Sequence, residues 1–281
     1  MASPFKELMA LDPTREQVEA WCRQRVQAVP SGPEGLLCRV LGKYLMYVHQ
    51  RDYSLTPHLA MNGIWEPWIT MAIARHVQPG MRCMDVGACY GYYSLLMADI
   101  VSESGYVEAW EPFWFAAVRN NAGINGLRIT VRDCLMGTDH GARYLGKVPK
   151  QILFNAGDVR LDRLTDPLRL VGAESPTNGI ATGAPDVAPY DFIKIDVEGS
   201  EMDVWAALCF VRQLSPNLTV CMEFTPKQHK DPRAALDSIV ADGFTMGSVG
   251  HDGVPRPCSI DEALVPDTGD FRMLWLTRRH L

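Results

Sequence analysis

From Arg82 onward, short apolar runs alternate with longer segments of helical periodicity. The apolar runs predict strands at Arg82–Val86, Tyr106–Glu111, Ile129–Arg132, Phe192–Asp196 and Leu218–Phe224. The periodic segments predict helices at Tyr92–Val101, Trp114–Asn121, Met202–Val211 and Pro232–Ala241. Strands that alternate with helices are typical of βαβ units, so we expect a parallel sheet covered by helices on both faces.

The C-terminal end departs from this alternation. Phe244–Val249 and Phe271–Thr277 follow each other without a full helix between them, which predicts an antiparallel pair at the edge of the sheet. Between Pro167 and Pro189 the chain is rich in Gly, Ala, Pro, Ser and Thr. So long a loop is usually functional or disordered, and it could be a substrate flap or a connector.

The N-terminal end is predicted to be helical. Thr14 could cap a helix that runs to about Val26, and a second apolar-periodic stretch covers Leu36 to Val48. A further helix is predicted over Pro67–Val77. We therefore expect an N-terminal helical extension and a single Rossmann-like domain, residues 1–55 and 56–281.

Charge and hydropathy indicate which classes of partner to expect. The chain of 281 residues has a formal net charge of −6, and nucleic-acid binders usually gather Lys and Arg, so no nucleic-acid partner is expected. No apolar segment follows a basic cluster at the start, and no apolar run is long enough for a bilayer, so neither a signal peptide nor a membrane partner is expected. The eight cysteines follow no metal-site spacing, which suits a cytoplasmic protein.

A strand end followed by two glycines is the first sign of a ligand site. The sequence MDVGACYGYYS ends the strand at an acidic residue, Asp85, and a loop with Gly87 and Gly91 leads into a helix. Glycine lets the backbone bend sharply and approach a ligand where a Cβ would clash. A dinucleotide fingerprint would have glycines where Cys89 and Tyr92 stand, so the loop is not shaped for a pyrophosphate.

Acidic residues after the next two strands could hold an adenosyl group. Glu111 ends the second strand, where a carboxylate can accept hydrogen bonds from both ribose hydroxyls, although it could also be a solvated strand-end residue. Asp133 follows the third strand, at the place of an adenine-binding residue or of a turn former. The predicted cofactor-binding residues are Asp85, Gly87, Ala88, Cys89, Gly91, Glu111 and Asp133.

A second motif lies on the fourth predicted strand. The segment from Asp191 to Glu201 reads DFIKIDVEGSE, and with DVGACYGYYS, WEP and CMEFTP it strongly resembles the FkbM family of methyltransferases, whose signature there is IKIDVEG-x-E. The resemblance runs from Asp52 to the C-terminus. It implies an α/β, Rossmann-like class I methyltransferase fold, with a seven-stranded, mostly parallel sheet and an antiparallel last strand. It also implies S-adenosyl-L-methionine as methyl donor, S-adenosyl-L-homocysteine as product, and O-methylation of sugars, polyketides or related small molecules.

The chain departs from the family's usual loop at one position. The loop usually reads D-V-G-A-N, and Cys89 stands in place of the Asn. An amide able to form hydrogen bonds is thereby lost, whereas Asp85 and both glycines are kept. Cofactor binding is still expected.

Three carboxylates are candidate catalytic residues: Asp196, Glu198 and Glu223. Asp196 arrives at the carboxyl end of its strand, where open parallel sheets bind ligands, and Glu223 ends the neighbouring strand at a similar height. An alcohol acceptor gains from a base that takes its proton, and Asp196 is the first choice. For Glu198 and Glu223, a structural role is an almost equal alternative, and a charge in the first turn of a helix would account for Glu198 and Glu201.

Other groups compete for these roles. His58, His229 and His251 are rival bases in loop-like surroundings. A divalent cation could bridge such carboxylates, although no spacing demands one and no metal ligand is assigned. The leading hypothesis is an S-adenosyl-L-methionine-dependent O-methyltransferase acting on a small-molecule or glycan hydroxyl. The alternatives are an N- or nucleic-acid methyltransferase, or a catalytically silent adenosyl-binding subunit, and the oligomeric state stays open, a homodimer included.

Overall fold

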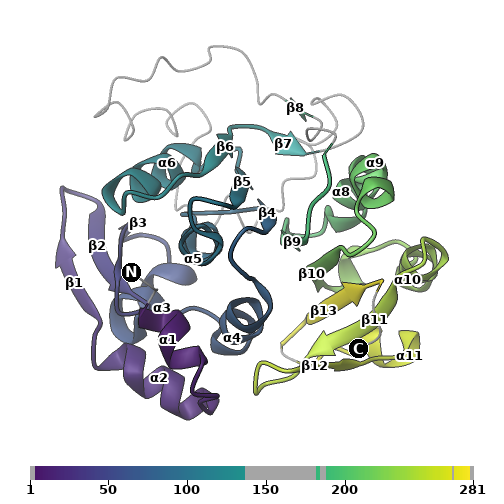
Figure 1. Ribbon diagram of the computed structural model, residues 1–281, viewed down its shortest axis with the longest axis horizontal. Coiled ribbons are helices and arrows are strands. Elements are labelled where there is room, and N and C mark those ends of the chain that lie inside the picture. The colour runs from purple at the N-terminus through teal and green to yellow at the C-terminus, as the bar shows by residue number, and fades with distance from the viewer. Residues whose placement is uncertain (1–3, 137–181, 184–187, 268, 279–281) are drawn as a thin grey trace.

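The computed structural model describes residues 4–136, 182–183, 188–267 and 269–278. Within this part of the chain the main body is an eight-stranded sheet in the order β12–β11–β13–β10–β9–β4–β5–β6 (Figure 1). Its strands are β4 (Arg82–Val86), β5 (Tyr106–Trp110), β6 (Thr130–Arg132), β9 (Phe192–Ile195), β10 (Thr219–Phe224), β11 (Thr245–Val249), β12 (Pro255–Pro257) and β13 (Arg272–Thr277).

The strand order reverses in the middle of the sheet. From β4 the chain builds β5 and β6 on one side, and it then returns to place β9 and β10 on the other side of β4. These five strands pair in parallel, whereas β13 runs antiparallel to both β10 and β11. In open α/β sheets, a crevice for ligands forms at the carboxyl ends of the strands that flank such a reversal, here β4 and β9.

The helices divide between the two faces of the sheet (Figure 1). One face packs against α4 and α5, and the other packs against α8 and α10. The helices of this body are α4 (Pro67–His76), α5 (Tyr92–Val101), α6 (Phe115–Ile124), α8 (Glu201–Ala207), α9 (Cys209–Leu214), α10 (Pro232–Ala241) and the short α11 (Ile260–Ala263). Side chains alternate along each strand, so Phe192 packs in the core on the side of α4 and α5, whereas Ile193 and Ile195 pack in the core on the side of α8 and α10.

Most predictions for this body are confirmed. Each of the five predicted strands and the antiparallel pair β11–β13 forms, and the Rossmann-like α/β class is correct. Two differences stand out. The strand β12 extends the sheet beyond the seven strands predicted, and the helix predicted over Met202–Val211 is two helices, α8 and α9.

The N-terminal region is only partly helical. Helices α1 (Pro4–Met9) and α2 (Arg15–Arg23) form, and Thr14 caps α2 as predicted. The cap is a reciprocal capping box with Gln17, and the helix ends at Arg23 rather than near Val26. The helix predicted over Leu36–Val48 is wrong. That stretch belongs to a three-stranded antiparallel sheet, built from β1 (Gln27–Pro30), β2 (Gly35–Val40) and β3 (Tyr44–His49). Helix α3 (Leu55–Asn62) follows this sheet.

Two asparagines of α6 join the small sheet to the main body. Figure 1 shows the small sheet beside α6. The Asn121 side chain accepts from the Tyr47 N–H (2.7 Å) and donates to its carbonyl (3.1 Å). One helical turn later, Asn125 makes the same two bonds to Leu45, at 2.9 and 2.7 Å. Two amide side chains thus take the place of a neighbouring strand along the edge of β3.

Two features complete the fold. A two-stranded pair joins β7 (Leu135–Met136) to β8 (Thr182–Gly183), while most of the predicted loop between residues 167 and 189 lies outside the described residues. None of the helices in the described ranges is long and apolar enough to cross a membrane.

Candidate active site

Strand register brings the polar residues of three strands to one face, at the edge where the strand order reverses. Asp85 on β4 stands opposite Lys194 on β9. Asp196 lies two residues after Lys194, just past the end of β9. On β10, Cys221 pairs with Lys194, and Glu223 lies two residues after Cys221. Because side chains alternate along a strand, Asp85, Lys194, Asp196 and Glu223 share the face that α4 and α5 cover.

The two sequence motifs meet at Gly87. The Asp196 N–H donates to the Val86 carbonyl (3.0 Å), which continues the β4–β9 pairing to the strand ends. Gly87 has φ +85°, and a Cβ there would lie 1.7 Å from the Asp196 carbonyl oxygen. Only glycine fits, because both the backbone conformation and the space exclude a side chain.

The rest of the loop is a tight turn into α5. Gly87 and Ala88 donate their N–H groups to the Trp110 carbonyl of β5, at 2.9 and 3.2 Å. Gly91 closes the turn with an N–H to the Ala88 carbonyl (2.7 Å) and has φ +88°. Cys89 is also left-handed, with φ +51°, which is uncommon for a residue other than glycine.

Glu111 holds this loop. One carboxylate oxygen accepts from the Cys89 N–H (2.8 Å), and the other accepts from the N–H groups of Phe113 (2.7 Å) and Trp114 (3.0 Å). The side chain is buried, and burial raises its pKa to about 7 against the effect of these N–H donors. Since a carboxylate has about four acceptor positions, a ribose would use the remaining one or displace an N–H group.

Lys194 is a buried cation at the centre of the site. Its Nζ donates to Asp196 Oδ2 (2.9 Å) and lies 4.6 Å from the centre of the Tyr93 ring. Burial alone would lower the Lys194 pKa, but the carboxylates of Asp196, Asp85 and Glu66 outweigh it, so the pKa lies above its usual value. The ammonium is therefore charged and fixes one oxygen of Asp196.

Glu66 reaches the same cluster from the N-terminal side. It occupies the N-cap position of α4, yet its side chain makes no capping hydrogen bond, and its backbone is left-handed (φ +39°). Instead the buried carboxylate accepts from the Tyr93 hydroxyl (2.7 Å). Burial raises the Glu66 pKa to about 7, with the Lys194 charge opposing. The helix thus lacks a side-chain cap, and the carboxylate faces the cluster.

Asp85 offers one open acceptor. Its Oδ2 accepts from the Ser94 hydroxyl (2.6 Å), whereas Oδ1 is buried without a hydrogen-bond partner among the described residues. Burial raises the Asp85 pKa, although Lys194 and Ser94 oppose it. A buried acceptor without a donor is a costly feature that a cationic or N–H group of a ligand would relieve.

Two further carboxyls carry raised pKa values beside Asp196. Desolvation, followed by the charges of Asp196 and Glu198, raises the Glu223 pKa to about 10. The Glu198 pKa is raised to about 7, first by desolvation of its carboxyl group and then by Asp196, although the residue as a whole is exposed. The three predicted catalytic residues therefore lie within electrostatic reach of one another.

Asp133 lies apart from this cluster. It is exposed and pairs with Arg119 of α6 at 3.2 Å. Sequence reasoning missed Glu66, Tyr93 and the role of Lys194. Lys194 gave a usable signal, a charged residue inside a strand that is otherwise apolar. Glu66 gave none, because its approach depends on a left-handed backbone at a helix start.

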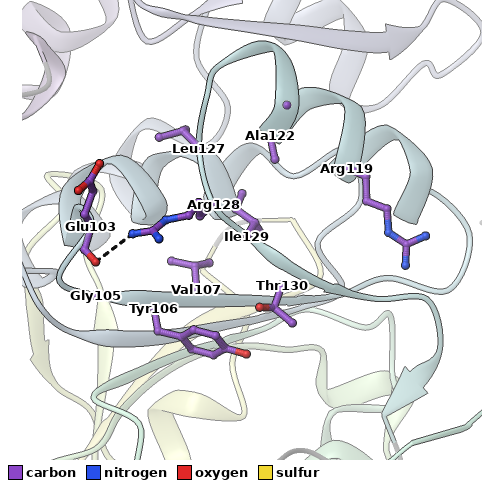
Figure 2. Close-up of a pocket in the computed structure, with 11 residues that line it drawn as sticks. Glu103, Gly105, Tyr106, Val107, Arg119, Ala122, Leu127, Arg128, Ile129 and Thr130 are labelled. Atoms are coloured by element: carbon purple, nitrogen blue, oxygen red, sulfur yellow. Dashed lines mark hydrogen bonds between the residues drawn. The ribbon is translucent and has the colours of Figure 1, made fainter. Parts of the chain in front are cut away.

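No metal site emerges from the described residues, since no three of their His, Cys, Asp and Glu side chains are grouped to hold an ion. A groove of about 540 Å³ opens between α6 and the starts of β5 and β6, lined by Arg119 and Tyr106 among others (Figure 2). None of the predicted catalytic or cofactor-binding residues lines it. The carboxyl ends of the strands, with their buried charges, are the more credible site of chemistry.

No family model matches the chain, and no curated protein matches its sequence. Among solved structures it is similar to a precorrin-6y C5,15-methyltransferase from Geobacter metallireducens, with 10% identity over 73% of this chain and 84% of that one and a TM-score of 0.39. It is similar to a putative O-methyltransferase from Klebsiella pneumoniae, with 15% identity, 71% and 74% coverage and a TM-score of 0.38. The 16S rRNA N2 G1207 methyltransferase of Thermus thermophilus matches with 12% identity, 89% and 52% coverage and a TM-score of 0.44.

At such identities and scores, these likenesses add nothing about activity or acceptor. The resemblance to the FkbM family stays a prediction.

Proposed function

We propose that this protein is an S-adenosyl-L-methionine-dependent methyltransferase that methylates a hydroxyl group of a small molecule or glycan. The observation that carries the proposal is the contact of Gly87 with the Asp196 backbone. It joins a glycine loop, of the kind that approaches a ligand closely, to a strand end that carries a candidate base. Both lie where the strand order reverses, which is where open α/β sheets bind ligands.

The residues present fit the donor. Asp85 Oδ1, buried without a partner among the described residues, would face the ammonium of the methionine portion. Glu111 would hold the ribose hydroxyls while it keeps the loop in place through Cys89. Lys194 interacts with five carboxyl groups, those of Glu66, Asp85, Asp196, Glu198 and Glu223. A bound cation would favour the ionised forms of these acids, and the donor carries a positive sulfonium.

The reaction needs alignment and one proton acceptor. The bound donor would supply the methyl group: a C–O bond would form as the S–C bond breaks, and S-adenosyl-L-homocysteine would leave as a neutral thioether. Lys194 Nζ occupies Oδ2 of Asp196, which leaves Oδ1 to take the hydroxyl proton. Because Asp196 is only partly buried, that oxygen can meet an acceptor from solvent.

Binding of S-adenosyl-L-homocysteine tests the donor site. A ligand that binds only the folded state at 100 times its Kd stabilises it by about 2.7 kcal/mol, so we expect Tm to rise by about 5–10 °C. Glu111→Ala should weaken binding by about 10- to 100-fold, since a hydrogen bond to a charged group contributes about 1.5–3 kcal/mol. Glu103→Ala, an exposed glutamate outside the site, is the matched control. If S-adenosyl-L-homocysteine causes no Tm shift and releases no heat on titration, the methyltransferase assignment is refuted.

Asp196→Asn tests the base. The change keeps the shape and removes the charge, so kcat for methyl transfer from labelled donor into fractionated metabolites should fall by about 10²–10⁴-fold. The Kd for S-adenosyl-L-homocysteine should stay within about twofold. If affinity falls and saturating donor restores the rate, Asp196 holds the donor instead. Donor binding without transfer to any hydroxyl compound would favour a silent adenosyl-binding subunit.

A further inference from the structure

A buried acid–histidine contact lies next to the candidate site. Glu201 begins α8, and its Oε1 accepts from the N–H groups of Gly199 (2.9 Å) and Val197 (3.4 Å). Its Oε2 is buried and lies 3.7 Å from His229 Nε2. Neither of these two atoms has a hydrogen-bond partner within the described ranges. Buried polar atoms in this state need a physical explanation.

His229 is fixed from the other side. It follows the short 3₁₀ helix η2 (Pro226–Gln228), and its ring stacks on Phe224 with the ring centres 4.6 Å apart and the planes 9° from parallel. Phe224 directly follows Glu223 at the end of β10. The histidine side chain is only 8% exposed. Its position is thus tied to the strand that carries the third candidate carboxylate.

The turn that Glu201 holds is strained. Glu198 has φ +56° and Gly199 has φ +100°, two left-handed residues in succession. A glutamate in this region persists only when its surroundings impose it. Glu201 supplies two of those restraints, and Gln228 packs beneath Gly199, where an added Cβ would lie 3.0 Å from its side-chain oxygen.

We propose that Glu201 and His229 are a pair of positioning residues that locks the Asp196–Gly199 turn against the end of β10. The pair fixes the spacing between the carboxylates of Asp196 and Glu198, in the turn after β9, and that of Glu223 on β10. What that spacing serves rests on the proposed methyl transfer. The contact also gives Glu201 a role beyond that of a charge in the first turn of α8, because Asp203 supplies such a charge on the same helix.

The charges around the pair agree with a close contact. Burial raises the Glu201 pKa to about 7, with Asp196 as the nearby charge, and burial lowers the His229 pKa, with Asp203 opposing. The imidazole is therefore neutral near pH 7, and a small approach of the two atoms from 3.7 Å to hydrogen-bond distance would let one hydrogen satisfy both.

Amide hydrogen exchange of the peptide covering residues 196–201 tests the lock directly. Glu201→Ala and His229→Phe should each speed its exchange by about 10-fold or more, since the phenyl ring keeps the stacking on Phe224 and removes only the nitrogen. Glu201→Gln keeps an acceptor for the two N–H groups and should restore slow exchange. Asp237→Asn, at an exposed carboxylate of α10, is the matched control and should leave exchange unchanged. Equal exchange in all variants would overturn the proposal.

Kinetics separate positioning from simple structural support. With labelled donor, His229→Phe should lower kcat by about 10²-fold, while the donor KM and the Kd for S-adenosyl-L-homocysteine change less than about twofold. A loss of donor affinity at unchanged kcat would contradict positioning. If the wild type neither binds S-adenosyl-L-homocysteine nor transfers methyl, the proposed function fails, and the exchange experiment still decides whether the pair locks the turn.

Discussion

Three residues other than glycine adopt left-handed conformations around the candidate site: Glu66, Cys89 and Glu198. They come from three separate segments, before α4, before α5 and after β9. Each such conformation costs about 1–3 kcal/mol and persists only where packing imposes it. Their gathering near the carboxyl ends of β4 and β9 indicates that the surrounding contacts hold this site in a shape that the local backbone alone would not adopt.

Cys89 provides a test at the scale of one residue. Asparagine tolerates a left-handed backbone better than most residues, whereas a β-branched residue there is a true outlier. We expect Cys89→Asn to keep or raise the free energy of unfolding and Cys89→Val to lower it by about 1–3 kcal/mol, as measured by urea unfolding.

Cys89→Ala is the control for loss of the thiol alone. If Val and Asn behave alike relative to Ala, the strain at position 89 has no energetic weight, and the departure from the usual loop sequence has no consequence for stability.

Among the elements, the hairpin β2–β3 shows where sequence reasoning failed. Tyr44, Met46 and Val48 are buried in strict alternation, a strand pattern, but the apolar run before them reads equally well as a helix. The turn between the strands places Leu41 and Gly42 at φ +49° and +66°. Gly42 is a usual turn residue but Leu41 is not, so the break between the two strands carried a weaker signal than a pair of turn residues would.

The residues of the candidate site also divide into those that local sequence pattern could predict and those that it could not. The strand-end positions of Asp85, Asp196 and Glu223 were predictable, because the alternation of strands and helices predicted a parallel sheet and the carboxyl ends of its strands meet at one edge. Glu66 and the contact between Glu201 and His229 were not, because they depend on a cap that is not made and on the packing of one loop beneath another. Local pattern fixes strands; it does not fix which loops touch.

Asn121 and Asn125 of α6 give a prediction at the scale of elements. Asn121 is fully buried and also donates to the Tyr90 carbonyl (2.9 Å), so Asn121→Ala leaves several buried backbone groups without partners. We expect it to lower the free energy of unfolding by about 2 kcal/mol or more. Asn125→Ala, at a half-buried position that water can reach, should cost less than about 1 kcal/mol.

Urea titration of both variants checks this order. Equal losses, or a larger loss for Asn125, would mean that the two amides do not secure the small sheet in the way described. Asn121→Asp, which places a carboxylate in a fully buried site against the Tyr47 and Tyr90 carbonyl oxygens, should cost at least as much as Asn121→Ala.

For the whole molecule, the buried acids predict an unusual pH dependence. Burial raises the pKa of Glu66, Glu111 and Glu201 from the usual 4.5 to about 7. Between these two values the folded state binds more protons than the unfolded state, so the free energy of unfolding falls as pH rises through that window. Stability in urea should therefore drop from about pH 5 to about pH 7, and Glu111→Gln should flatten the curve.

The sign separates this effect from that of ordinary paired carboxylates, whose lowered pKa values make stability rise with pH. A urea midpoint that climbs across the same window would show that these acids are ionised at little cost in the folded protein.

The contact between α6 and β3 has a consequence for molecules in crowded solution. A strand edge with free amides is a template for pairing with another chain. On the far edge of the small sheet, β1 is exposed but short and ends in Pro30, which cannot donate a further bond. The six-residue β3 contains no proline, and the side chains of Asn121 and Asn125 form hydrogen bonds with its edge. Any event that lifts α6 away, whether heat or partial unfolding, uncovers a ready site for intermolecular β-pairing, and aggregation would start there.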